Sequence, residues 1–123
     1  MKGTNERKYD LEERLIDFVL QLDDITEKLP STRLSNHLAS QIVRSSTSPA
    51  LNYGEAQAAE SQRDFVHKMQ IILKELRETK ICLKIIMRKK YIESEKTNPV
   101  LVENEELIAI FAASVKTAKL ELR

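Results

Sequence analysis

Apolar residues recur in four stretches of the chain at alternating intervals of three and four positions. In the first stretch these residues are Leu11, Leu15, Phe18, Leu22, Ile25 and Leu29. Such spacing places the apolar side chains on one face of a helix that packs at a shallow angle against its neighbours. We therefore expect a helix over about residues 10–28 with Asp10 as its N-cap. It should end at Pro30, because a residue before proline avoids the α conformation.

Three further apolar stretches predict helices over about residues 31–60, 61–91 and 103–122. Ser31 and Ser61 are candidate N-caps, and the acidic residues between 103 and 106 favour the positive N-terminal end of the last helix. Pro49 should kink the second helix because proline removes a backbone donor. The predicted fold is therefore all-α, an antiparallel up-down-up-down four-helix bundle over residues 10–123 that follows a polar tail at residues 1–9.

Composition favours one helical domain and argues against several protein classes. The chain has 123 residues, 41% of them hydrophobic, and its 2 Gly and 3 Pro are too few for the turns of a sheet-rich fold. A single Cys excludes an intramolecular disulfide and suits a reducing compartment. The sequence has neither an apolar run of about 20 residues nor an apolar segment near its start. We therefore expect a cytoplasmic protein without a membrane partner.

The nearly neutral total charge hides a basic third helix. The whole chain holds 20 Lys and Arg against 19 Asp and Glu, whereas residues 63–90 hold nine basic and three acidic residues, a net charge of +6. The later basic residues form a predicted nucleic-acid-binding ridge, comprising Arg77, Lys80, Lys84 and Arg88 and extended by Lys89 and Lys90. The alternative is a solvated face whose cations complement the helix C-terminus. Tyr91 is the only aromatic residue nearby, so phosphate contacts rather than base stacking would lead any binding.

The second predicted helix has an unusual core face, because its apolar stripe turns polar after Leu38. The positions that continue the stripe are Gln41, Ser45, Ser48, Asn52 and Glu55. If these side chains are buried, their hydrogen bonds would fix the register or the oligomeric state of the bundle. If the helix is rotated, they face water instead, and the kink expected at Pro49 leaves both interpretations open.

The sequence contains no recognisable catalytic or cofactor motif. Asp64 and His67 form a single i, i+3 pair, whereas a di-iron bundle needs two such motifs and two more carboxylates. Cys82 lies among apolar residues, which is typical of a buried structural thiol. The chain also lacks a glycine-rich phosphate loop and a Gly-x-Ser-x-Gly motif. We therefore expect a protein that is not an enzyme and holds no metal or other cofactor.

The third predicted helix carries more apolar surface than one bundle seam requires. The additional residues, which lie off its main apolar stripe, are Ile71, Ile81, Cys82 and Ile85. Extra apolar surface on a helix needs another partner. We therefore expect a homo-oligomer that forms through the additional apolar face of the second and third helices.

One segment resembles the signature of a known bacterial family. Gln41-Ile-Val-Arg-Ser-Ser-Thr-Ser-Pro-Ala-Leu-Asn52 is similar to its Gln-x-x-Arg-(small)-x-x-Ser-(x)-x-x-Asn motif, and shorter matches occur at Leu29-Pro30, Asp64-Phe65, Leu76-Arg77-Glu78 and Tyr91-Ile92. The family comprises four-helix-bundle proteins often encoded in intervening sequences of 23S ribosomal RNA genes, and it includes the accessory variability determinant of diversity-generating retroelements. Where the family usually has Asn-Ile-Ala-Glu-Gly, this chain has Asn52-Tyr53-Gly54-Glu55-Ala56, which moves the glycine.

The resemblance implies a ring-like assembly, a homopentamer in known members, with RNA or a reverse transcriptase as a further partner. It also implies roles in assembly or bundle packing for the signature positions Gln41, Arg44, Ser45, Ser48, Asn52, Glu55 and Glu78. We therefore expect a non-catalytic oligomeric module that binds RNA or serves as a nucleoprotein accessory. The alternative is a protein–protein interaction scaffold with no nucleic-acid role.

Overall fold

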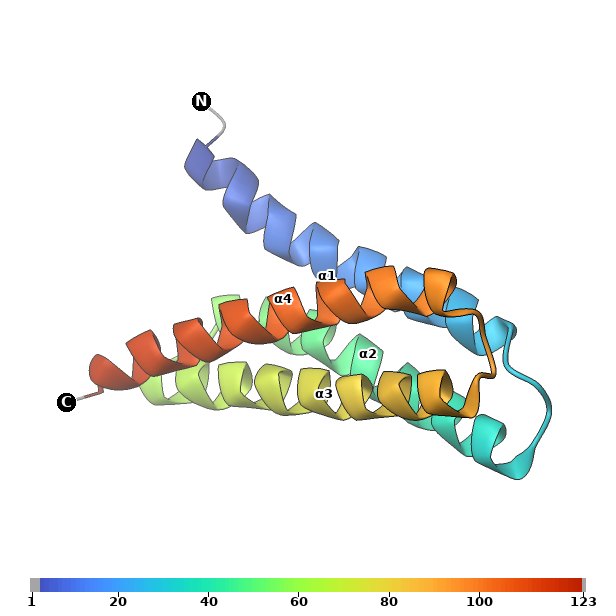
Figure 1. Cartoon of the computed structure of the whole chain (residues 1–123). Helices are drawn as coiled ribbons and strands as arrows, with labels where there is room; N and C mark the ends of the chain where they lie inside the picture. Colours follow the sequence, from blue (N-terminus) through green and yellow to red (C-terminus); the bar gives the residue numbers. More distant parts are fainter. Residues whose placement is uncertain (1–2, 123) are drawn as a thin grey trace.

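The protein folds as four antiparallel helices joined by short connections (Figure 1). The computed structural model describes the backbone of residues 3–122 and the side chains of residues 11–122. The helices are α1 (Gly3–Glu27), α2 (Arg33–Gln57), α3 (Gln62–Lys89) and α4 (Ser94–Leu120). This architecture confirms the predicted all-α four-helix bundle.

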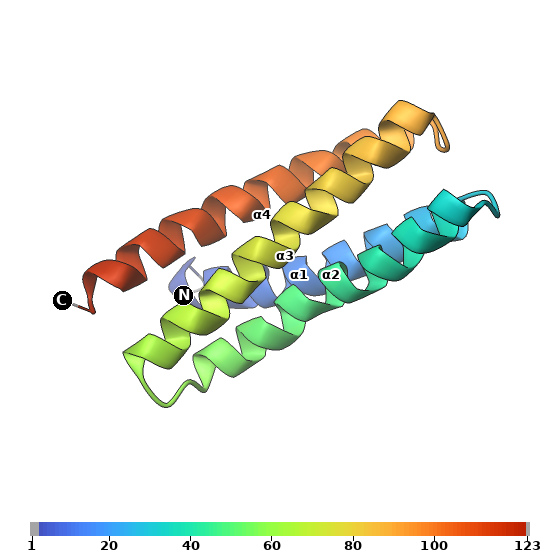
Figure 2. The same cartoon turned by 90° about the horizontal axis from the view of Figure 1, so that it is seen from below.

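The four helices pack around one core in the order in which they follow along the chain. α2 contacts α1 and α3, and α4 contacts α3 and α1, whereas α1 and α3 make no contact within the described residues. Figure 2 accordingly shows α3 in front of the bundle, with α1 behind it. Toward its N-terminal end, α1 diverges from α4 (Figure 1). The outer face of α3 is therefore diagonally opposite α1.

The core is built from the apolar stripes that the sequence predicted. The largest fully buried apolar side chains are Leu15, Phe18, Leu22, Ile42, Ile72, Leu76, Leu83, Ile86, Leu107 and Phe111. The rings of Tyr53 and Phe111 meet edge to face, with centroids 5.9 Å apart and an interplanar angle of 84°. Among residues 3–122, no helix combines the length and apolar character needed to cross a membrane.

Two helices begin earlier than the sequence predicted. α1 starts at Gly3, so Asp10 lies inside the helix and is not its N-cap, and the backbone of residues 3–9 is helical rather than a separate tail. α4 starts at Ser94 and includes Pro99, although proline lacks the backbone N–H that would otherwise donate to the Glu95 carbonyl. The acidic residues between 103 and 106 therefore lie in the interior of α4, and their expected placement at its N-terminus was wrong.

Side-chain capping fixes where α2 and α3 begin. The N-cap of α2 is Thr32 and not Ser31, and its hydroxyl accepts a hydrogen bond from the Ser35 amide at 3.1 Å. Ser61 caps α3 as predicted, accepting from the Asp64 amide at 3.0 Å. α2 runs without interruption to Gln57 through the buried Pro49, and the kink expected there stays a prediction.

Candidate functional site

A cluster of polar side chains joins α2 to α3 near the middle of the bundle. We call this set the α2–α3 polar cluster. Its members come from two facing helices and are Gln41, Arg44, Ser45, Glu75, Glu78 and Thr79. Four of these residues are also positions of the family signature, and the structure places them together: Gln41, Arg44, Ser45 and Glu78.

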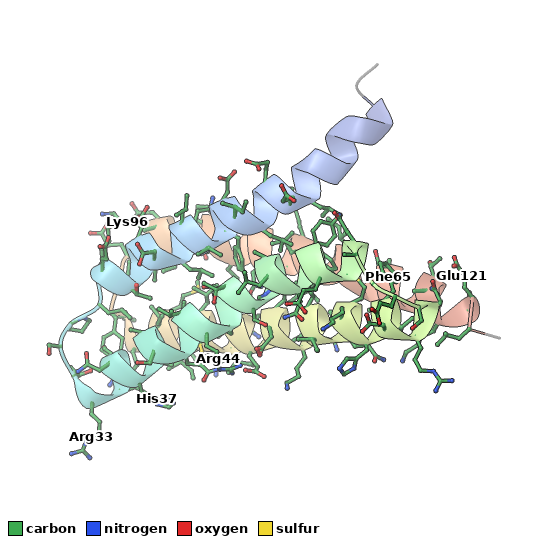
Figure 3. The ribbon with its side chains drawn as sticks, turned by 180° about the vertical axis from the view of Figure 1, so that it is seen from behind. Arg33, His37, Arg44, Phe65, Lys96 and Glu121 are labelled. Carbon is green, nitrogen blue, oxygen red and sulfur yellow. The ribbon has the colours of Figure 1, made fainter. Side chains whose placement is uncertain are left out.

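Arg44 is the centre of the α2–α3 polar cluster. Its Nη1 donates to both carboxylate oxygens of Glu75, at 2.9 and 2.7 Å, and its Nη2 donates to Oε1 of Glu78 at 2.6 Å. These hydrogen bonds, first to Glu75 and then to Glu78, raise the pKa of the Arg44 guanidinium above its ordinary value. Gln41 adds a hydrogen bond from Nε2 to Glu78 at 2.9 Å. Figure 3 shows Arg44 at the edge where α2 meets α3.

Glu75 and Thr79 are the two members that do not belong to the family signature, and Glu75 is the charged one. Its side chain is only 3% exposed, although it carries a carboxylate. Burial of a charge is costly unless the charge is paired and hydrogen-bonded, and here Arg44 provides both. The available signal was the i, i+3 pair of Glu75 and Glu78, which places two carboxylates on adjacent turns of one helix.

The polar stripe of α2 changes from buried to exposed along its length. Ser45 is completely buried, and its hydroxyl lies 2.7 Å from that of Thr79. Asn52 donates from Nδ2 to the backbone carbonyl and hydroxyl of Ser48, at 2.9 and 3.0 Å, so this pair is internal to α2. Glu55 is exposed and accepts from Lys68 at 2.8 Å. Both earlier interpretations of the stripe therefore hold, each for a different part of α2.

The predicted basic ridge is exposed except for one member. Arg77, Lys84 and Arg88 are exposed on α3, whereas Lys80 turns toward α4 and lies 3.2 Å from the carboxylate of Glu105. Lys89 and Lys90 are also exposed, at the end of the helix. The ammonium group of Lys89 lies 5.5 Å from the ring centroid of Tyr91, and Lys90 has left-handed backbone geometry with φ of 56°.

The exposed face of α3 is longer than this ridge. Exposed residues recur at intervals of three and four along almost the whole helix, and we call them the α3 outer stripe: Arg63, His67, Gln70, Lys74, Arg77, Ile81, Lys84 and Arg88. Five of the eight are Lys or Arg and none is acidic. The acidic residues of α3, namely Asp64, Glu75 and Glu78, are partly or fully buried off this stripe. The outer stripe is therefore a basic surface without acidic residues, in which His67 and Gln70 separate Arg63 from the other cations.

The surface of α1 has the opposite charge. Its exposed acidic residues are Glu12, Glu13, Asp17, Asp23, Asp24 and Glu27. Within the part of the chain whose side chains are described, one group of potential metal ligands occurs, in which carboxylate oxygens of Asp23, Asp24 and Glu27 lie within 4.8 Å of one another. All three side chains are exposed, as is common for acidic groups that hold no ion. The bundle is thus acidic on α1 and basic on α3.

The expected assembly face of α3 is mostly covered by the bundle itself. Cys82 is buried, Ile71 and Ile85 are half-buried, and Ile81 alone of the four is exposed. Burial raises the pKa of the Cys82 thiol, which opposes formation of the reactive thiolate. Exposed apolar side chains gather instead on α1 and α2, and we call this set the α1–α2 apolar patch: Ile16, Leu20, Val43 and Leu51. Leu20 and Val43 line one shallow depression between the two helices.

Comparison with known proteins agrees with this architecture. Residues 7–113 match the sequence model of the family described as "23S rRNA-intervening sequence protein". No curated protein matches the sequence. Among solved structures, the chain is similar to a protein of unknown function from the S23 ribosomal protein family of Bacteroides thetaiotaomicron. The two chains share 27% identity over 85% of this chain and 97% of that one, with a TM-score of 0.75. The chain therefore belongs to the 23S rRNA-intervening sequence protein family.

Proposed function

We propose that this protein is a non-catalytic, oligomeric RNA-binding module that acts as a nucleoprotein accessory. The observation that carries the proposal is the α3 outer stripe, which presents five exposed cations and no carboxylate on one face. The family description, which refers to sequences within 23S rRNA, is consistent with an RNA partner.

The chemistry of the stripe favours contacts with the phosphate backbone. Lys and Arg side chains that neutralise phosphates release condensed counterions, so binding weakens steeply as salt increases. The stripe carries no Phe, Tyr or Trp, and His67 is its single ring, so it offers bases little stacking surface. We expect strong dependence on salt and little dependence on base sequence.

Assembly would strengthen this interaction. Several copies arranged in a ring would present several outer stripes, and their summed field attracts RNA more strongly than one stripe does. The α1–α2 apolar patch would provide the contact surface for a second copy, whereas the sequence led us to expect a face formed by the second and third helices. Five copies in the ring and a reverse transcriptase as an additional partner stay predictions.

The decisive experiment reverses two charges on the stripe. Arg77→Glu with Lys84→Glu should weaken binding of a structured RNA at least tenfold at low salt and reduce the salt dependence, measured by fluorescence anisotropy. Both side chains are exposed, so the fold should be retained, which circular dichroism would check.

The matched control is Lys28→Glu with Lys96→Glu, an equal charge change on the far side of the molecule. Both lysines line a shallow depression between α1 and α4, and Lys96 lies beside α1 in Figure 3. The control should bind RNA less than threefold more weakly than the wild type. Equal losses in both variants would mean that total charge matters and that the stripe is not the binding site.

A protein-interaction scaffold is the second candidate, and the α1–α2 apolar patch is the observation that favours it. Such a scaffold would associate with its partner at high salt and would purify without nucleic acid. The ratio of absorbance at 260 nm to that at 280 nm distinguishes the two candidates. The chain has no Trp and only 3 Tyr, so bound nucleic acid would dominate this ratio. A purified sample without nucleic acid that also binds no added RNA would favour the scaffold.

A further inference from the structure

We infer that the ligand of the α3 outer stripe is double-stranded RNA, held along the whole length of α3 and not only at the predicted ridge. This inference rests on the proposed function and specifies its ligand. It adds Arg63 and Lys74 to the interface, and neither residue belonged to the predicted ridge.

The first argument is the length and straightness of the basic surface. Arg63 and Arg88 lie near the two ends of α3, about 38 Å apart at 1.5 Å per residue. Arg63 and Lys74 supply cations on the N-terminal half, and Arg77, Lys84 and Arg88 supply them on the C-terminal half. A rigid double helix can lie along such a surface and contact all five side chains at once.

The second argument is the shape of the face. α3 packs against both α2 and α4, so its outer side is the one that is exposed. Reading the DNA major groove requires a helix that enters the groove. Double-stranded RNA presents a wide, shallow minor groove that is recognised through phosphates and 2′-hydroxyls. The exposed side of α3 is therefore better placed to contact the shallow minor groove of an RNA duplex than to enter the DNA major groove.

The third argument is the position of the aromatic residues. Tight binding of single strands uses exposed rings on which the bases stack. Among the described side chains, Tyr53 and Phe111 are in the core, and Phe18 is completely buried. Phe65 is half-buried beside Met69, and the hydroxyl of Tyr91 lies 3.4 Å from that of Thr32. Among the described Phe and Tyr rings none faces outward along the stripe, and His67 is the single exposed ring on it, so unpaired bases find at most one stacking ring there.

The acidic surface of α1 restricts the binding to one side. α1 lies diagonally opposite α3, and its exposed carboxylates repel phosphates. A polyanion that approaches the molecule is therefore directed to the α3 face.

The test compares three labelled ligands on the full chain by fluorescence anisotropy: a 20-base-pair RNA duplex, one of its strands, and the DNA duplex of the same sequence. The RNA duplex should bind at least tenfold more tightly than the single strand and more tightly than the DNA. Arg63→Glu with Lys74→Glu should weaken duplex binding at least tenfold. It should also reduce the slope of log K against log salt by about 0.9 for each lost contact. The control variant Lys28→Glu with Lys96→Glu should retain binding.

The outcomes separate this inference from the proposed function. Single-stranded RNA bound as tightly as the duplex, or DNA bound as tightly as RNA, would overturn the duplex RNA inference and leave the RNA-binding function standing. Unchanged binding by Arg63→Glu with Lys74→Glu, combined with loss in Arg77→Glu with Lys84→Glu, would confine the interface to the predicted ridge. Absence of binding to every ligand would overturn both proposals.

Discussion

At the scale of single residues, two buried polar side chains from facing helices satisfy each other in the interior of the bundle. The hydroxyls of Ser45 and Thr79 are completely buried and lie 2.7 Å apart. Each supplies the partner that water would otherwise provide, so neither group is left unsatisfied. A buried polar group costs stability chiefly when its partner is removed, which makes this pair a sensitive test of the α2–α3 interface.

We expect Thr79→Val to destabilise the protein by about 1–2 kcal/mol, because it leaves the Ser45 hydroxyl buried without its partner. Adding Ser45→Ala should recover part of this loss, since both polar groups are then gone. Urea unfolding monitored by circular dichroism measures both free energies. Strictly additive losses in the double variant would show that the two hydroxyls do not interact.

The tyrosines predict a dependence of stability on alkaline pH. Burial raises the pKa of the Tyr53 hydroxyl above its ordinary value of 10.0, so the folded protein holds this proton more tightly than the unfolded chain does. The resulting stabilisation is complete below about pH 10 and is lost as the pH rises through the folded pKa. Tyr53→Phe should therefore lose less stability than the wild type between pH 9 and pH 11, measured by urea unfolding.

Tyr91 provides a control of opposite sign for the alkaline experiment. Its hydrogen bond with Thr32 lowers the pKa of the Tyr91 hydroxyl. This group therefore gains stabilisation as the pH rises past its folded pKa, and Tyr91→Phe should lose more stability than the wild type over the same range. If the stability of both variants differed from that of the wild type in the same direction over this pH range, the opposite pKa shifts assigned to Tyr53 and Tyr91 would be contradicted.

At the scale of helices, the sequence predicted the buried faces well and the helix ends less well. The alternating three- and four-residue spacing identifies a face because it reflects the geometry of every turn. Helix ends depend on single capping contacts and on neighbours. Pro99 was expected to lie before the last helix, yet α4 includes it and loses one backbone donor there. Asp10 has the chemistry of an N-cap but lies within α1.

The N-terminus of α2 allows a direct test of capping. Thr32→Ala should destabilise the protein by about 1 kcal/mol, because the Ser35 amide loses its hydrogen-bond acceptor. The neighbouring Ser31→Ala is the matched control and should be nearly neutral, since Ser31 is exposed and does not cap the helix. Thermal unfolding of the two variants gives the comparison. A greater loss of stability for Ser31→Ala than for Thr32→Ala would show that Ser31, and not Thr32, caps α2.

At the scale of the whole molecule, charge is separated between opposite helices although the sum is only +1. Part of this pattern could be predicted, because the basic excess of residues 63–90 is visible in the sequence. Which basic residues share a surface could not be predicted, since this depends on how α2 and α4 cover α3. Lys80 has the spacing of the ridge but pairs with Glu105 of α4. Arg63 and Lys74 share the outer stripe with the C-terminal cations only because α3 stays exposed along its full length.

The proposed assembly also belongs to the scale of the whole molecule, and the α1–α2 apolar patch predicts where copies would meet. If the protein forms this oligomer, Val43→Glu should convert it into monomers, because the substitution would place a charge at an apolar contact between copies. Light scattering after size exclusion measures the mass at low and high salt. The control is Ile81→Glu, an exposed apolar position on α3 outside the patch, which should leave the mass unchanged. A wild-type protein that is monomeric under both conditions would refute the assembly.

The α2–α3 polar cluster has a further consequence for the folding landscape. Purely apolar helix faces pack almost equally well after one helix slides along another by a turn, about 5.4 Å. Such a slip would separate Arg44 from Glu75 and leave the buried carboxylate facing apolar side chains. The cost of stranding that charge makes the displaced arrangement much less stable than the native one. The α2–α3 polar cluster thus favours the native alignment of α2 against α3 over alignments displaced by a turn, which leucine side chains alone would permit.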